Sequence, residues 1–324
     1  MKDNKGLICG FYLSGDNKGT PIDWQSIPEQ LPENGAVWLH FDYTHKNSKL
    51  WLEKQGSIEG FICEALLEDE TRPRTSFVSN GLLLSLRGVN LNPSSDPEDM
   101  VSIRLWSDGK NVISTQRRTL LSINEMTSLI SLKKGPESPG QFVAILTESL
   151  IDRMKGTIQD IEDKVARIEE IVLDSESYSL RSEIANLRRQ AISLRRYLSP
   201  QREAMSQLQN DRIDWFTQSD RIHIRETNDS LIRYIEDLDL ARDRAAVTQE
   251  ELVNRLSEQL NKRMYVLSIV AAVFLPLGFL TGLLGINVGG IPGVDNPYAF
   301  TIFLFFLVVV VGIQVWIFKI KKWF

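Results

Sequence analysis

The sequence predicts an α+β domain, made of an α/β sheet and a helical hairpin, followed by a long stalk helix and two transmembrane helices. Three observations lead to this fold class. Short runs with strand alternation occur only before residue 135, heptad-spaced apolar residues follow from Gly140, and two uncharged apolar segments lie within the last sixty residues. Nearly all of the charge precedes residue 264, so the chain divides into a polar part and a membrane part.

The composition excludes several classes of protein. A length of 324 residues leaves room for about two domains. The formal net charge of −5 argues against a nucleic-acid partner, which would require a basic face. Cys9 and Cys63 are the only cysteines, so the chain has neither a disulfide framework nor a CxxC zinc knuckle. The first fifteen residues lack the apolar core of a cleaved signal peptide.

Residues 1–139 are expected to form the α/β domain. Apolar residues alternate as in strands over three segments, and Asp108–Gly109 is a hairpin turn signal within the last of them. These segments are 35–43, 75–91 and 100–118. Helical spacing is found at 47–56, 59–70 and 122–135.

Residues 140–210 are expected to form an antiparallel helical hairpin that turns at `DSESYS` (174–179). Each arm carries apolar residues at alternating spacings of three and four, which is the pattern of a packed helix pair. The stripes are Met154, Ile158, Ile161, Val165, Ile168 and Val172, then Leu180, Ile184, Leu187, Ala191, Leu194 and Leu198. Pro200 is expected to end or kink the second arm.

Residues 211–263 are expected to form a stalk helix. Its pattern begins near Arg221 and contains no glycine or proline before Pro276, so the helix is expected to continue into the membrane. A helix of this length cannot bury itself within one subunit. The sequence therefore predicts a homo-oligomeric bundle.

Two spans are predicted, at 264–285 and 298–318, because each is long enough for a bilayer core, which needs about 20 apolar residues. Lys262 and Arg263 precede the first span, and the tail 319–324 is basic. The connecting loop, 286–297, carries only Asp295. The positive-inside rule then places both termini in the cytoplasm and the loop outside.

One stripe of the stalk and first span contains no lysine or arginine. Its members are Gly282, Gly278, Leu275, Ala271, Ser268, Met264, Asn261, Ser257, Asn254, Glu250, Val247 and Asp243. Periodicity leaves two interpretations open: small residues that let membrane helices approach closely, or the wall of a water-filled path. Two spans cannot enclose a lumen, so a path requires a ring of subunits, each contributing its first span. The carboxylates Asp243 and Glu250 would then concentrate cations near the path.

Asn287 stands at the end of the first span. In a ring of subunits it would form a circle of amide oxygens that replaces part of a cation's hydration shell. The alternative is that Asn287 only caps the helix.

The segment `GIN` at 285–287, which closes a Pro-containing span in a C-terminal two-span hairpin, resembles the Gly-x-Asn signature of CorA-type divalent cation transporters. The continuation `TGLLGINVGGIPG` (281–293) is similar to the ZntB-like zinc-transporting branch of that superfamily. The likeness extends to `ETRPR` (70–74), `STQRR` (114–118) and `RRYLSPQR` (195–202), so it covers essentially the whole chain.

The resemblance implies a homopentameric, CorA-like funnel in a bacterial inner membrane, with the first span lining the pore. It implies transport of Zn²⁺, with Cd²⁺, Ni²⁺ and Co²⁺ as related cargo, coupled to the proton gradient in the uptake direction, although efflux is an alternative. Gly285, Ile286 and Asn287 would be the selectivity signature. Two features depart from the magnesium branch: Ile286 replaces its usual Met, and the loop lacks the acidic pair that often follows the signature.

No cofactor and no tight metal site are expected, because tight binding of a permeating ion stops conduction. His40, His45 and His223 are scattered, and His223 is the one accessory candidate. Three functions are weighed: a zinc-type transporter, a CorA-like Mg²⁺ or Co²⁺ channel, and a membrane-tethered coiled-coil scaffold. An enzyme is not expected, since the glycine-rich run follows a membrane span and lacks the Lys-Ser/Thr of a phosphate loop.

Overall fold

The computed structural model describes residues 5–28, 31–32, 36–55, 58–78, 81–174, 178–210, 213–285, 293 and 296–320. The chain divides into two compact units, Met1–Glu250 and Glu251–Phe324.

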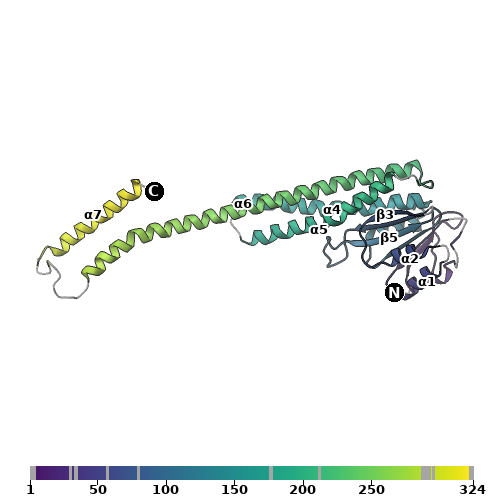
Figure 1. Cartoon of the computed structure of the whole chain (residues 1–324), viewed down its shortest axis with the longest axis horizontal. Coiled ribbons are helices and arrows are strands. Elements are labelled where there is room, and N and C mark those ends of the chain that lie inside the picture. The colour runs from purple at the N-terminus through teal and green to yellow at the C-terminus, as the bar shows by residue number, and fades with distance from the viewer. Residues whose placement is uncertain are drawn as a thin grey trace. The chain divides into compact units, whose positions relative to one another are not determined.

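The first unit is built on a six-stranded mixed sheet with strand order β1-β2-β6-β5-β4-β3 (Figure 1). Only β2 and β6 pair in parallel, and every other neighbouring pair is antiparallel. The strands are β1 (Leu7–Tyr12), β2 (Val37–Asp42), β3 (Arg74–Val78), β4 (Gly81–Gly88), β5 (Val101–Ser107) and β6 (Val112–Gln116). The α+β prediction is therefore confirmed for this unit.

The predicted hairpin turn at Asp108–Gly109 joins β5 to β6. Gly109 has a φ of +84°, a conformation that glycine adopts at no steric cost. The Asp108 carboxylate accepts hydrogen bonds from the backbone N–H groups of Lys110 (2.8 Å) and Asn111 (2.5 Å), which closes the turn. Strand β1 was not among the predicted strands, and segment 75–91 contains two strands, β3 and β4, rather than one.

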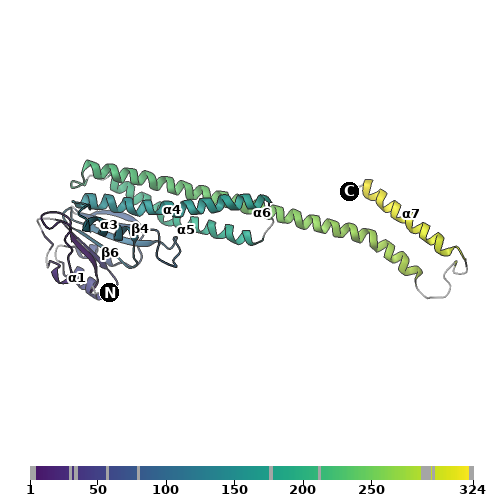
Figure 2. The same ribbon diagram turned by 180° about the vertical axis from the view of Figure 1, so that it is seen from behind.

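Helices cover both faces of the sheet (Figure 2). On one face, α1 (Lys46–Lys54) and α2 (Gly60–Leu67) lie over an apolar core, where the Phe41 and Trp51 rings are 4.9 Å apart. On the other face, α4 (Pro139–Asp174) contacts β4, and its Phe142 ring lies 4.9 Å from that of Trp38. Helix α3 (Leu121–Ser131) packs against α4, and a short 3-10 helix spans Trp24–Ser26.

Three long helices pack together beside the sheet in the first unit. Helix α5 (Tyr178–Asn210) runs antiparallel to α4, and the start of α6 (Gln218–Leu284) packs against both. The residues that meet between them are Val165, Ile168, Ile184, Leu187, Ala245 and Thr248. All twelve residues of the two predicted heptad stripes are buried.

Pro200 does not end α5, which continues ten residues beyond it to Asn210. Proline removes one hydrogen bond from the helix interior. The buried residues that follow, Gln201, Ala204 and Met205, attach this last part of α5 to the sheet. The tertiary contacts therefore outweigh the local breaking effect of the proline.

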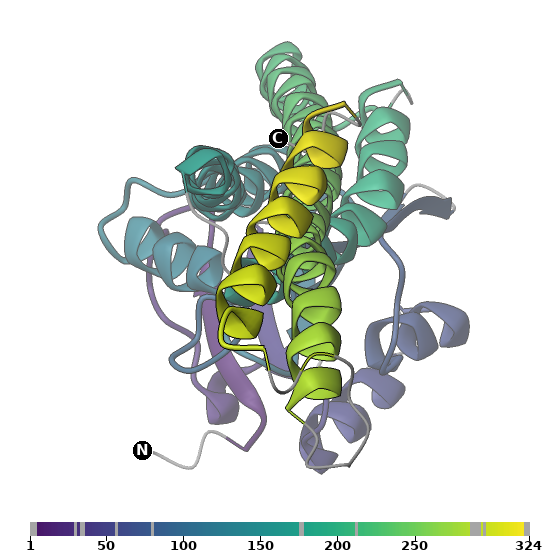
Figure 3. The same ribbon diagram turned by 90° about the vertical axis from the view of Figure 1, so that its left-hand side faces the viewer.

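The second unit contains the end of α6 and helix α7 (Ala299–Ile320) (Figure 3). Within the described part of the chain, α6 and α7 are the two helices long and apolar enough to cross a membrane. Helix α6 continues through Pro276 without a break. A groove of about 520 Å³ separates the two helices and is lined almost wholly by carbon. Its residues are Phe274, Leu277, Gly278, Thr281, Leu304, Leu307, Val308 and Val311. The predicted pair of C-terminal apolar helices is thus confirmed.

Candidate ion-conduction surface

Within the first unit, the polar stripe lies on the face of α6 that α4 and α5 leave open. Asp243, Val247 and Glu250 are all exposed, whereas Ala245 and Thr248, on the other side of the helix, are buried. Val247 is an apolar residue with 67% of its surface exposed. This exposed face therefore requires water, another subunit or both beside it.

The two carboxylates of the stripe differ in their surroundings. Asp243 accepts hydrogen bonds from the Arg242 guanidinium, at 3.0 Å from Nε and 2.8 Å from Nη2. Glu250 forms no ion pair with any other described residue. The negative charge of Asp243 is therefore partly offset, whereas that of Glu250 is not offset by an ion pair.

The basic residues near the stripe form ion pairs with carboxylates, most of which lie off the stripe. Arg244 forms an ion pair with Glu169 of α4, and Arg242 also contacts Asp239 at 3.1 Å. In the second unit, Arg255 pairs with Glu251 at 2.7 Å. These contacts place each of the guanidinium groups beside a carboxylate.

The remaining stripe residues lie along the second unit. Asn261, Met264, Ser268, Leu275 and Gly282 are exposed, and Ala271 is half-buried. Ser268 donates its hydroxyl to the Met264 carbonyl at 2.8 Å, within the same helix. Gly278 borders the groove toward α7. Most described side chains of both spans are exposed in the single chain. The half-buried residues of the first span include Ile269, Val273, Leu277 and Leu280, which recur at helical spacing beside the stripe, so the stripe residues share a face that stays largely exposed.

Gly285 closes α6 at the predicted signature. Its N–H group donates to the carbonyls of Thr281 (2.9 Å) and Gly282 (3.2 Å), and a Cβ at this position would lie 3.0 Å from the Thr281 oxygen. These are the hydrogen bonds of a helix end, and the helix backbone leaves little room for a side chain at this position. Ile286, Asn287 and Asp295 lie outside the described residues.

The three histidines lie in separate environments. His40 is fully buried on β2, where its Nδ1 is 2.7 Å from the Ser114 hydroxyl, and burial lowers the pKa of His40 to about 4. His45 caps α1 by accepting from the Asn47 N–H at 3.2 Å. His223 is exposed on α6. No group of three His, Cys, Asp or Glu residues placed to hold a metal occurs in the described part of the chain.

One further cluster was not singled out from the sequence. Arg87 of β4 lies in a cleft with residues from `ETRPR` (70–74) and `RRYLSPQR` (195–202). Both segments belong to the family resemblance, but the sequence alone indicates no separate role for them. Both segments are rich in arginine, and this shared feature is the sequence signal from which the cluster could have been predicted.

Comparisons with known proteins agree with this architecture. The family model described as CorA-like Mg²⁺ transporter protein matches residues 33–321. A "Divalent cation transporter CmaX" from Pseudomonas aeruginosa is 39% identical over 99% of this chain and 98% of its own length. A "Zinc transport protein ZntB" from Pectobacterium carotovorum is 36% identical over 99% of this chain and 97% of its own.

Solved structures show the same similarity. The structure of full-length CmaX has a TM-score of 0.85, with 37% sequence identity and 99% of each chain covered. The complete CorA magnesium transporter from Methanocaldococcus jannaschii has a TM-score of 0.80 at 16% identity, with 100% of each chain covered, and so supports the fold alone.

Proposed function

The chain belongs to the CorA-like Mg²⁺ transporter family, and on this premise we propose that it transports Zn²⁺ across the bacterial inner membrane through a pore formed by five copies. That it is a divalent cation transporter of the CorA and ZntB family follows from relatives that match over its whole length. Zinc as the main cargo, uptake as the direction and five subunits as the assembly are the proposed steps.

The observation that carries the proposal is the exposed stripe of α6, which is free of lysine and arginine and leads from the first unit into an apolar span. In a ring of subunits, equivalent Glu250 carboxylates would face a common axis. They would raise the local concentration of cations without binding one tightly. The amides and hydroxyls of Asn254, Ser257 and Asn261 would then line the wetted route, since such groups can replace lost hydration.

At the outer end, Gly285, Ile286 and Asn287 would form the narrowest part of the route. Gly285 has no side chain at the point where α6 ends, so neighbouring backbones can approach closely there. A ring of Asn287 amide oxygens would exchange with water molecules around the ion. Both chain ends would face the cytoplasm, as the charges flanking the spans predict.

Zinc is favoured over magnesium by the ZntB-named relatives, and by Ile286 in place of the signature Met of the magnesium branch. The scaffold alternative is disfavoured because an anchor needs neither the glycine-rich continuation of the signature nor a stripe without basic residues. Efflux and Mg²⁺ or Co²⁺ conduction are treated as outcomes of the following experiment.

The test is flux into proteoliposomes that contain the purified full chain, with ⁶⁵Zn²⁺ and Mg²⁺ compared under pH gradients of either sign. We expect Zn²⁺ entry that depends on the sign of the gradient, and loss of that entry in Asn287→Ala. Asn296→Ala is the matched control, because Asn296 lies in the same loop and its amide oxygen accepts from the Tyr298 N–H at 2.9 Å. Absence of flux in the wild type, or unchanged flux in Asn287→Ala, would refute the mechanism.

A further inference from the structure

A cleft of about 410 Å³ lies in the first unit, where chain segments distant in sequence meet. It is lined by Glu70, Thr71, Arg72, Arg87, Arg196 and Tyr197. The first three residues lie just before β3, Arg87 belongs to β4, and the last two belong to α5. The charge of this cleft is mainly positive and would repel cations, so the cleft is not part of a cation pathway.

Arg87 forms the floor of this arginine cleft, and only neutral groups hold it. Its guanidinium donates to the Thr71 carbonyl from Nε (3.3 Å) and Nη2 (3.1 Å), and to the Met100 carbonyl from Nη1 (3.0 Å). It also stacks over the Tyr197 ring at 4.2 Å. Burial lowers the pKa of Arg87. The charge is therefore fixed in position, and no described carboxylate forms an ion pair with it.

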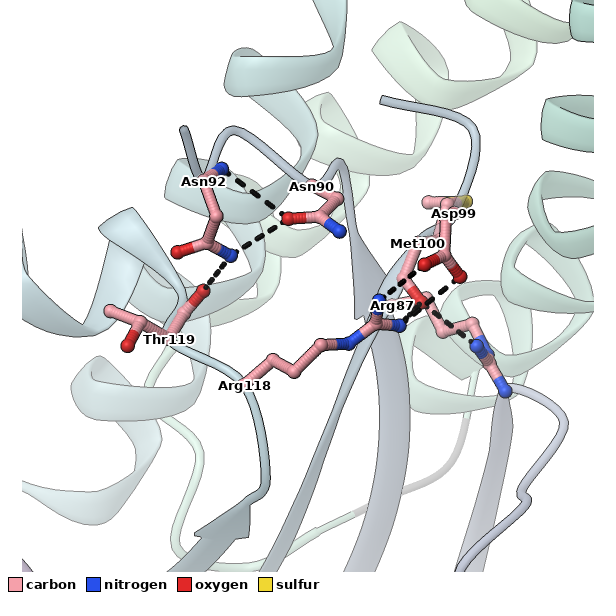
Figure 4. A network of polar contacts seen from close by, with 7 residues as sticks. All are labelled: Arg87, Asn90, Asn92, Asp99, Met100, Arg118 and Thr119. Carbon is pink, nitrogen blue, oxygen red and sulfur yellow. Dashed lines mark hydrogen bonds and ion pairs between the residues drawn. The ribbon is translucent and has the colours of Figure 1, made fainter. Parts of the chain in front are cut away.

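Glu70 and Asp99 both interact electrostatically with Arg87, but Asp99 is already paired. Asp99 forms an ion pair with Arg118, which also donates to the Met100 carbonyl at 3.3 Å (Figure 4). Arg87 and Arg118 thus share one carbonyl acceptor, and Asp99 balances only one of the two charges. The same network anchors the loop before β5, since the Asn92 amide donates to the Thr119 carbonyl at 3.0 Å.

A buried arginine adds further positive charge nearby. Arg104 is fully buried, donates from Nη2 to the Asp69 carbonyl at 3.0 Å, and lies 4.6 Å from the Tyr43 ring. Its Nε and Nη1 atoms have no hydrogen-bond partner. Burial first, and the nearby charge of Arg87 to a smaller extent, lower the pKa of Arg104. Buried positive charge without an ion-pair partner is costly and favours a bound anion.

The two arginines at the mouth of the cleft are available to a ligand. Arg72 and Arg196 are exposed, and neither forms an ion pair with another described residue. Arg196 donates to the Tyr197 hydroxyl at 2.8 Å, which directs it toward the cleft lining. Three arginines and one carboxylate, Glu70, therefore line the cleft in a chain whose net charge is −5.

We propose that this cleft is a binding site for a small phosphate-bearing anion, with Arg72 and Arg196 contacting the phosphate above the fixed charge of Arg87. Guanidinium groups match phosphate oxygens in pairs, which makes arginine the residue of choice for this recognition. Ligand pockets commonly measure about 300–1,000 Å³, so the cleft has room for a nucleotide as well as for free phosphate. The site does not depend on which cation the chain transports.

The test is calorimetric titration of the purified full chain in detergent, in phosphate-free buffer containing EDTA, with inorganic phosphate, pyrophosphate and ATP as separate probes. We expect saturable binding of at least one probe. Affinity should fall about tenfold or more in Arg72→Gln with Arg196→Gln, since two charge-assisted contacts are lost. Arg72→Lys should retain part of the affinity. Tighter binding of ATP than of phosphate would identify a nucleotide site, and the reverse a phosphate site.

Arg74→Gln is the matched control. Arg74 is an exposed arginine two residues from Arg72, pairs with Glu68 at 3.3 Å and does not line the cleft. Equal loss of affinity in this control, or no saturable heat with any probe, would overturn the proposal. A fall in oligomer mass in the double variant, without phosphate binding in the wild type, would instead mean that a second copy supplies the anion, and would overturn it as well.

Discussion

Gln201 of α5 and Arg87 of β4 exchange two hydrogen bonds across the interface between helix and sheet. The Arg87 N–H donates to the Gln201 side-chain oxygen at 2.8 Å, and the Gln201 amide donates to the Arg87 carbonyl at 3.1 Å. Gln201 is fully buried. The Gln201 amide therefore supplies a hydrogen-bond partner to both the N–H and the carbonyl of Arg87, whose side chain forms the floor of the arginine cleft.

Removing this amide should destabilise the first unit. We expect Gln201→Ala to cost about 1–3 kcal/mol, because it leaves the part-buried N–H and carbonyl of Arg87 without partners. Thermal unfolding of the full chain in detergent, followed by tryptophan fluorescence, measures the loss. The neighbouring Arg202→Ala, at an exposed position, should leave the midpoint nearly unchanged. Equal midpoints for wild type and Gln201→Ala would contradict the role assigned to the amide.

His40 should make the stability of the first unit dependent on pH. Burial lowers the pKa of His40 to about 4 in the folded state, against 6.5 for the ordinary group. Between these values the unfolded chain binds a proton that the folded chain does not, so stability falls as the pH drops from 6.5 to 4. At about 1.4 kcal/mol per pH unit, the loss attributable to His40 is about 3 kcal/mol.

The measurement is the unfolding midpoint of the full chain at intervals between pH 7 and pH 4. His40→Gln should flatten the slope, because the substituted side chain does not titrate. His223→Gln should leave the slope as it is, since His223 is exposed. An identical slope in His40→Gln would assign the acid sensitivity to other groups.

The fold could be predicted largely from local patterns. The heptad stripes of α4 and α5 and the two apolar segments follow directly from helical period and length. Strand β1 could not be predicted in this way, because `LICGFY` is short and contains a glycine. It becomes a strand only by pairing with β2. The expectation that Pro200 could end α5 was wrong for a related reason. The contacts that hold the rest of α5 come from a sheet more than a hundred residues away in sequence.

The candidate sites could be predicted only in part. The helical period placed Asp243 and Glu250 on one face, and the structure of the first unit leaves that face uncovered. Sequence could not reveal that Arg242 turns toward Asp243, since adjacent residues do not share a helix face and the contact depends on side-chain rotamers. The arginine cleft could not be predicted either. It forms because the fold brings Arg87 of β4 into contact with both Thr71 and Tyr197, which are distant from it in sequence.

The difference between the two carboxylates yields a prediction about cation entry. Glu250→Lys should slow Zn²⁺ entry several-fold at low ionic strength, and the effect should shrink as salt screens the charge. Asp243→Asn should have a smaller effect, since Arg242 already offsets that charge. Initial rates of ⁶⁵Zn²⁺ flux into proteoliposomes at two salt concentrations measure both.

Two off-stripe changes serve as controls for this prediction. Glu251→Lys makes the same change of charge one residue along α6, and Arg255→Glu reverses the charge of its partner. Both should change the entry rate less than Glu250→Lys does, with Glu251→Lys slowing entry slightly and Arg255→Glu raising it slightly. If Glu251→Lys slowed entry as much as Glu250→Lys, and Arg255→Glu sped it by a similar factor, the charge would act through the general field of the protein rather than from one face.

Gly282 gives the sharpest test of the path through the membrane. A Cβ added at Gly282 meets nothing within 4 Å in the single chain, and the same is true of Gly312 on α7. Gly282→Val and Gly312→Val should therefore both insert and fold, so a defect confined to Gly282→Val must arise where copies of α6 face one another. We expect flux to fall about tenfold or more in Gly282→Val, because bulky apolar side chains close a narrow pore by dewetting. Flux in Gly312→Val should stay near that of the wild type. If the two variants lost flux equally, α6 would not present this stripe to the pore, since then a valine on either helix would act through general packing in the bilayer.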